Sequence, residues 1–157
     1  MYKITNVLFL DDDENRHHEF KKIMDEVNEE AKLGVGTREE YDIVDTAEKA
    51  IEALKTDKYE VVFLDHDLGG KVYVNSSDKD TGAEVARWLK VNPTPISMII
   101  VHTLNPDGSK NMLKELYDGD YSAHCLPFLL PGYHNAANYK LIVNHVWETC
   151  DLEEDGK

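Results

Sequence analysis

Charged and polar residues follow directly after three short apolar runs of this chain. The runs at residues 7–10, 61–64 and 98–101 are followed by Asp11-Asp12-Asp13, by Asp65-His66-Asp67 and by His102-Thr103. Converging carboxylates bind hard divalent cations, and imidazole titrates near neutrality and can therefore move protons. The three clusters indicate metal-assisted or acid–base chemistry, provided that the fold brings them together.

The order of the elements predicts how these clusters meet. Apolar runs and helical periodicity predict strands at 5–11, 41–45, 60–65, 97–102 and near 122–126, and helices at 14–31, 46–56, from 81 to before Pro93, 106–117 and 138–149. We expect Asp45, Thr81 and Asn105 to be helix N-caps. The alternation predicts an α/β fold, a doubly wound five-stranded parallel sheet with helices on both faces. Ligands bind at the carboxyl ends of such strands.

A polar insertion follows the third predicted strand at residues 68–80. Gly69-Gly70 and Asn75-Ser76-Ser77 flank its short apolar stretch Val72-Tyr73-Val74. We expect this insertion to form a small hairpin or a mobile flap.

Length and charge restrict the classes of protein and ligand. The 157 residues fit one domain, predicted at 1–150, and 151–157 form an acidic, solvated tail. A net charge of -14 disfavours long nucleic acid but permits a small phosphorylated ligand if a metal or a few basic residues neutralise it. No apolar run approaches the roughly 18 residues of a membrane span. Two cysteines without a CxxC pattern predict free thiols, so we expect the cytoplasm, or the host cytoplasm for a viral protein.

The clusters suggest a metal site. The candidate ligands are Asp11, Asp12, Asp65 and Asp67, and oxygen ligands favour Mg²⁺ or Mn²⁺. Alternatively, Asp12 or Asp13 is the N-cap of the first helix.

Proton transfer and phosphate binding have further candidates. His66 and His102 are the expected acid–base pair beside Asp65, and the alternative is that each is a hydrogen-bonded structural histidine. Arg16, Thr103 and Asn105 are the expected phosphate-binding residues. Their alternatives are an ion pair for Arg16 and an N-cap role for Asn105.

Residues 5–149 resemble the response-regulator receiver domain, with Asp11 and Asp12 at its Mg²⁺ positions and Asp65 at its phosphoacceptor position. Leu126 stands where that family carries a lysine. The chain is more similar to the cyclic-phosphate-processing receiver-like domains, which carry three signatures after the first, third and fourth strands. Here these read Asp11-Asp12-Asp13-Glu14-Asn15-Arg16, Leu64-Asp65-His66-Asp67-Leu68-Gly69 and His102-Thr103-Leu104-Asn105-Pro106-Asp107-Gly108.

Three functional hypotheses follow. The first is a metal-dependent phosphoesterase that processes a cyclic phosphate, either a 2′,3′-cyclic RNA end or a cyclic nucleotide, as the resemblance implies. The second is a stand-alone receiver domain with Asp65 as phosphoacceptor, which Leu126 disfavours. The third is a noncatalytic protein whose acidic surface binds or inhibits a basic protein partner.

Overall fold

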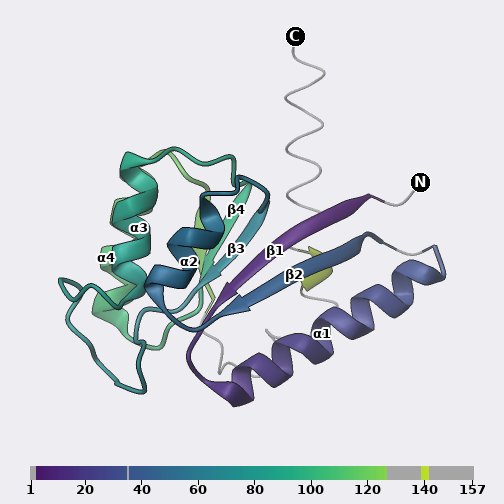
Figure 1. Ribbon diagram of the computed structural model, residues 1–157, viewed down its shortest axis with the longest axis horizontal. Helices are drawn as coiled ribbons and strands as arrows, with labels where there is room; N and C mark the ends of the chain where they lie inside the picture. Colours follow the sequence, from purple (N-terminus) through teal and green to yellow (C-terminus); the bar gives the residue numbers. More distant parts are fainter. Residues whose placement is uncertain (1–2, 35, 127–138, 142–157) are drawn as a thin grey trace, which may run out of the picture.

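A five-stranded parallel sheet organises the chain. The computed structural model describes residues 3–34, 36–126 and 139–141. The strand order is β2-β1-β3-β4-β5, and the arrows in Figure 1 point toward one common edge. The strands are β1 (Ile4–Leu10), β2 (Arg38–Val44), β3 (Val61–Leu64), β4 (Met98–Val101) and β5 (Ala123–Cys125). This topology confirms the predicted doubly wound α/β fold.

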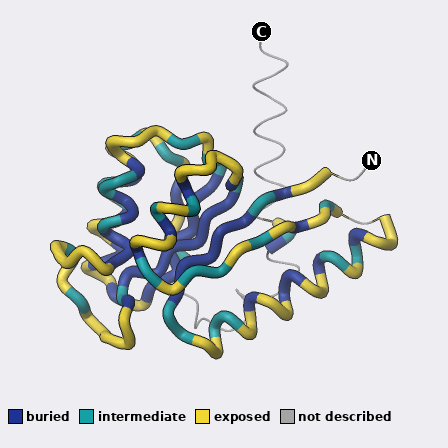
Figure 2. The backbone as a smooth tube through the Cα atoms, viewed as in Figure 1, coloured by how far each residue is buried: buried dark blue, intermediate teal, exposed yellow. Residues whose placement is uncertain are grey.

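Helices cover both faces of the sheet. They are α1 (Glu14–Lys32), α2 (Ala47–Leu54), α3 (Gly82–Val91) and α4 (Pro106–Asp118), and α1 lies on the face opposite the other three (Figure 1). Successive strand residues point to opposite faces: Val7 and Phe9 pack with the core under α1, whereas Leu8 and Leu10 pack with the core under α2 to α4. Every residue of β3 and β4 is buried, as the dark centre of Figure 2 shows.

Side-chain oxygens fix where the helices begin. Asn105 is the N-cap of α4, as predicted, and its Oδ1 accepts from the Gly108 N–H at 2.9 Å. Thr81 caps α3. The prediction for α2 was wrong by one residue, because Thr46 is its N-cap. The carboxylate of Asp45 instead pairs with Lys49 four residues later, at 2.7 Å.

The insertion at 68–80 consists of turns and contains no hairpin ladder. One isolated antiparallel bridge, between Asp67 and Thr81, closes its base. The guanidinium of Arg87 donates to the Ser76 carbonyl at 2.6 Å and ties the insertion to α3. Of the two expectations, a hairpin with a strand ladder is therefore not formed, and Val72 and Tyr73 at the centre of the insertion are 78% and 76% exposed.

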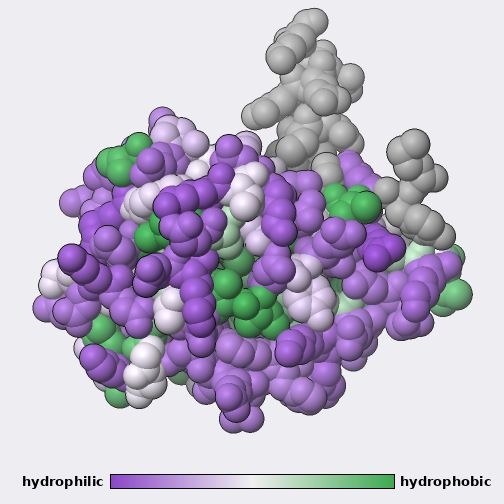
Figure 3. All heavy atoms as spheres, viewed as in Figure 1, coloured by the Kyte–Doolittle hydropathy of each residue, from purple (hydrophilic) through white to green (hydrophobic). Residues whose placement is uncertain are grey.

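Most of the surface visible in Figure 3 is hydrophilic, in keeping with 31 acidic residues. Within the described ranges, no helix has both the length and the apolar character that crossing a membrane requires. Residues 139–141 are helical, as predicted for the last helix. The rest of that helix, Cys150 and the acidic tail at 151–157 lie outside the described residues.

Candidate functional site

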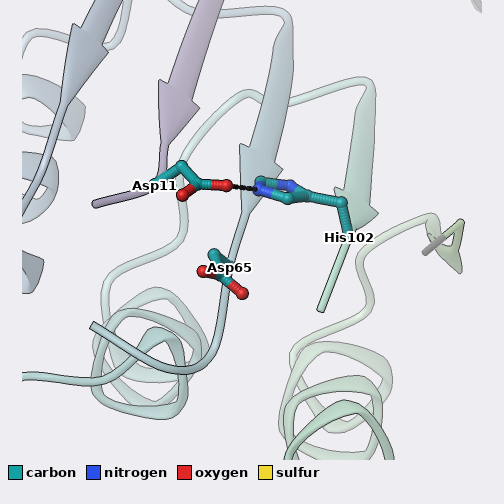
Figure 4. A group of neighbouring side chains, drawn as sticks. All are labelled: Asp11, Asp65 and His102. Carbon is teal, nitrogen blue, oxygen red and sulfur yellow. Dashed lines mark hydrogen bonds and ion pairs between the residues drawn. The ribbon is translucent and has the colours of Figure 1, made fainter. Parts of the chain in front are cut away.

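The register of the sheet aligns three polar residues in one row. Leu10 pairs with Leu64, and Leu64 pairs with Val101, so the next residues are Asp11, Asp65 and His102. The ladder continues through this row, since the Asp65 and His102 N–H groups donate to the Leu10 and Leu64 carbonyls of the neighbouring strands, each at 3.0 Å. Figure 4 shows the three side chains converging from neighbouring strand ends. In-register residues share one face of a sheet, here the face that α1 covers.

The three side chains form a compact buried cluster. One potential ligand atom from each lies within 4.8 Å of the others. Nε2 of His102 lies 2.9 Å from Oδ2 of Asp11, the dashed contact in Figure 4. The ring of His102 stacks on Phe9, with centroids 4.9 Å apart, which fixes its orientation. The cluster is therefore held by packing as well as by hydrogen bonds.

Arg16 reaches this cluster from the first turn of α1. Its Nε lies 3.0 Å from Oδ2 of Asp11, and its Nη2 lies 3.4 Å from Oδ2 of Asp65. Asp13 caps α1 and accepts from the backbone N–H of Arg16 at 3.1 Å, so the helix start holds the arginine beside the strand ends. The guanidinium thus makes the ion pair that was the alternative to a phosphate contact, and Asp13 takes the predicted N-cap role.

The two carboxyl groups of the cluster have pKa values displaced in opposite directions. Burial alone would raise the pKa of Asp11, but the hydrogen bond and charge of His102, together with the charge of Arg16, hold it below its usual value. Burial raises the pKa of Asp65 to about 6, with the charge of Asp11 adding to the shift and His102 and Arg16 opposing it. Asp65 can therefore exchange a proton near neutral pH.

The donor set of the cluster fits a divalent metal ion. Two carboxylates and one imidazole within 4.8 Å match a transition metal such as Mn²⁺ better than Mg²⁺, which prefers oxygen ligands. Asp12 and Asp67, the other predicted ligands, lie outside this group. Oδ2 of Asp12 accepts from the Gly70 N–H, and the Asp67 carboxylate accepts from two N–H groups of the insertion at 2.7 and 3.0 Å.

His66 lies next to this cluster in sequence, but its ring is bonded elsewhere. Its Nδ1 lies 2.7 Å from Oδ1 of Asp67, and its Nε2 lies 2.9 Å from Oγ of Ser76. The ring packs so closely on α4 that a Cβ on Gly108 would lie 2.4 Å from it. Nδ2 of Asn105 donates to Asp67 at 3.1 Å. These contacts match the structural alternatives for His66 and Asn105.

A cavity of about 380 Å³ opens beside the cluster. Asp65 lines it, whereas Asp11 and His102 are not among its lining residues. The remaining wall residues come from the loop after β1, the first turn of α1, the segment after β3 with the insertion, and the start of the β4–α4 loop: Asp12, Asp13, Glu14, Asn15, Arg16, Asp67, Gly70, Lys71, Val72, Thr103 and Leu104. Of the three predicted phosphate-binding residues, Arg16 and Thr103 line this cavity, and Asn105 is not among its lining residues.

Two residues at the site were given no role by the sequence-based predictions. Lys71 lines the cavity from an insertion that was expected to be a hairpin or flap, so no spacing placed it near Asp65. Gly108 leaves room for the His66 ring, and only the third signature drew attention to it. Leu126 extends the row beside His102, its N–H donating to the Val101 carbonyl at 2.9 Å.

Comparisons with known proteins agree with this geometry. A family model described as "Cyclic-phosphate processing Receiver domain" matches residues 6–118. A search of curated protein sequences found no match.

Solved structures of receiver domains share the fold. The signal receiver domain of a repressor protein from Vibrio parahaemolyticus has a TM-score of 0.66 and 18% identity, with 99% of this chain and 98% of that chain covered. A two-component response regulator from Clostridium difficile has a TM-score of 0.61 and 22% identity, and the match covers 92% of this chain and 96% of that chain. A CheY-like receiver domain from Methylobacillus flagellatus has a TM-score of 0.58 and 18% identity, with 92% and 99% covered.

Proposed function

Because the chain belongs to the cyclic-phosphate processing receiver domain family, we propose that it is a metal-dependent phosphoesterase that opens a cyclic phosphate. The substrate is a 2′,3′-cyclic RNA end or a cyclic nucleotide. One observation carries the proposal: Asp11, Asp65 and His102 converge beside a cavity large enough for a phosphate group.

The residues support a division of roles. Asp11, Asp65 and His102 would hold a divalent ion such as Mn²⁺. When bound, this ion neutralises phosphoryl charge and lowers the pKa of a water molecule. Asp11 and His102 lie behind the cavity wall and are suited to holding the ion, whereas Asp65 also reaches the ligand space.

Hydrolysis requires one bond to form and one to break at phosphorus. The oxygen of the attacking water bonds to phosphorus while the ring P–O bond breaks, and the leaving ribose oxygen takes up a proton. The Asp65 carboxylate has two oxygens, and the one that does not hold the ion would accept the proton of the water and pass it on to the leaving oxygen. Thr103 lines the cavity and its Oγ1 accepts from the Asn105 N–H at 3.1 Å, so its own hydroxyl hydrogen would be donated to a phosphoryl oxygen.

Turnover of defined substrates tests this proposal. Purified protein is incubated with 2′,3′- and 3′,5′-cyclic nucleotides and with RNA ending in a 2′,3′-cyclic phosphate, in Mn²⁺ or Mg²⁺. We expect ring opening that Asp65→Asn abolishes. Asp78→Asn is the matched control, because Asp78 is exposed in the insertion and does not line the cavity. Metal binding measured by calorimetry without turnover of any substrate would refute the proposal.

A second function is favoured by the position of Asp65 at the end of β3. Asp65 is one of the residues that line the cavity, although it is only 2% exposed, so this role requires a small phosphodonor to enter this cavity and transfer a phosphoryl group to its carboxylate. Intact-mass measurement after incubation with acetyl phosphate and Mg²⁺ tests this phosphoacceptor role. A mass increase of one phosphoryl group in the wild type, absent in Asp65→Asn, would support it. An unmodified wild-type protein would reject it.

A further inference from the structure

The charge of the cavity wall opposes the anion that the proposed function requires. Five carboxylates line it, against two cations, Arg16 and Lys71; the carboxylates belong to Asp12, Asp13, Glu14, Asp65 and Asp67. A phosphate group is repelled by such a wall unless positive charge faces it directly. The ion held by the cluster supplies part of that charge, and the two basic side chains are the other sources on this wall.

Arg16 and Lys71 differ in whether their charge is already paired with a carboxylate. The guanidinium of Arg16 lies against the carboxylates of Asp11 and Asp65, at 3.0 and 3.4 Å. Lys71 makes no side-chain ion pair or hydrogen bond with any residue in the described ranges. Other exposed lysines of the described ranges, such as Lys79, are also unpaired, but Lys71 is the one among them that lines this cavity. Its charge is therefore available to a ligand in the cavity.

The backbone on both sides of Lys71 is anchored to the site. Gly69 and Gly70 adopt left-handed conformations, with φ of 73° and 71°, and the Gly70 N–H donates to the Asp12 carboxylate. On the other side, the Tyr73 N–H donates to Asp67 at 2.7 Å. These two contacts hold the short segment that carries Lys71 in place beside the cavity that Lys71 lines.

We propose that Lys71 is the phosphate-binding lysine of this site, its ammonium contacting a non-bridging oxygen of the phosphoryl group. This inference rests on the proposed function, because it assigns the ligand's anion to the same cavity. Leu126 extends the row of strand ends with an apolar side chain that packs against the core under α1. Lys71 of the insertion therefore adds to the positive charge that Arg16 presents on the cavity wall.

Paired lysine variants test the inference. Lys71→Gln removes the charge, Lys71→Arg keeps it, and Lys79→Gln is the matched control, an exposed lysine of the same insertion that does not line the cavity. With Mn²⁺ present, calorimetry measures the Kd of inorganic phosphate, and a separate assay measures KM and kcat for 2′,3′-cyclic AMP. Losing one charge-assisted hydrogen bond should weaken phosphate binding about tenfold in Lys71→Gln. Lys71→Arg and Lys79→Gln should stay close to wild type.

The two readouts separate this inference from the proposed function. Tight phosphate binding that depends on Lys71, without turnover of the cyclic nucleotide, would support the inference and count against hydrolysis. Turnover or phosphate binding that is equal in Lys71→Gln and Lys79→Gln would overturn the inference and leave the proposed function standing. A wild-type protein that binds no phosphate and turns over no substrate would overturn both.

Discussion

Glu39 is a buried carboxyl group remote from the cluster, and its removal should change how stability depends on pH. It is 3% exposed, near the start of β2. Its side chain accepts from the Thr37 hydroxyl at 2.6 Å and from the Tyr139 hydroxyl at 2.8 Å. Burial raises its pKa from 4.5 to about 7, with the charge of Glu60 adding to the shift and the hydrogen bonds opposing it. Glu39→Gln keeps the shape of the side chain and removes the titration.

The direction in which the free energy of unfolding changes with pH follows from whether the folded or the unfolded chain holds the proton of Glu39. Below pH 4.5 the carboxyl group is protonated in both the folded and the unfolded chain. As the pH rises from 4.5 to about 7, the unfolded chain releases this proton and the folded chain keeps it, so the free energy of unfolding falls. At 1.36 kcal/mol for each pKa unit, the loss amounts to about 3 kcal/mol and is complete above pH 7. Glu39→Gln should not show this loss.

Urea unfolding of both proteins between pH 4.5 and 8 measures the effect. We expect the variant to gain about 3 kcal/mol relative to wild type across this range, because the difference cancels titration at all other sites. Glu40→Gln is the matched control, since Glu40 is the exposed neighbour on the same strand. Parallel stability curves for wild type and Glu39→Gln would refute the assignment of a raised pKa to this residue.

Three further predictions concern the site itself. Gly108→Ala should cost about 3 kcal/mol in urea unfolding, because the new Cβ would meet the His66 ring. His102→Asn should weaken Mn²⁺ binding measured by calorimetry, whereas His66→Asn should lower the unfolding free energy and leave Mn²⁺ affinity unchanged; equal metal affinities would contradict the ligand role of His102. Arg16→Gln should tighten Mn²⁺ binding at pH 8 about tenfold, because the guanidinium that repels the ion from the carboxylates is removed; weaker binding would argue that Arg16 helps to build the site.

The sequence was sufficient to predict most of the fold, because strands buried on both faces of the sheet appear in the sequence as continuous apolar runs. Apolar residues recur at helical spacing along α1, and the five that form this pattern are all buried: Phe20, Ile23, Met24, Val27 and Ala31. Strand β2 begins three residues earlier than predicted, in the polar stretch Arg38-Glu39-Glu40. The Asn28 side chain on α1 bonds both the N–H and the carbonyl of Glu39, at 2.8 and 3.1 Å. Such a side-chain contact from a helix leaves no periodic signal in the strand.

The sequence predicted where the candidate site lies better than it predicted which residues form it. Polar residues after apolar runs correctly located the carboxyl edge of the sheet. Spacing alone could not show that Asp12 turns to the Gly70 N–H, since that contact depends on the path of the insertion. The same path brings Lys71 into the cavity wall. Contacts between loops distant in sequence depend on tertiary geometry, which single-chain patterns do not encode.

The alternation of strand side chains explains why Asp65 and His66, neighbours in one motif, take different roles. Asp65 continues the row of Asp11 and His102 on the α1 side, while the His66 ring packs against Gly108 of α4 on the other side. A shift of one residue in the pairing of β3 would exchange these sides and bring His66 into the cluster. Because the apolar residues of β3 are buried on both faces, such a shift would also misplace the core. The register that packs the sheet is thus the same constraint that places Asp65 in the cluster and the His66 ring against α4.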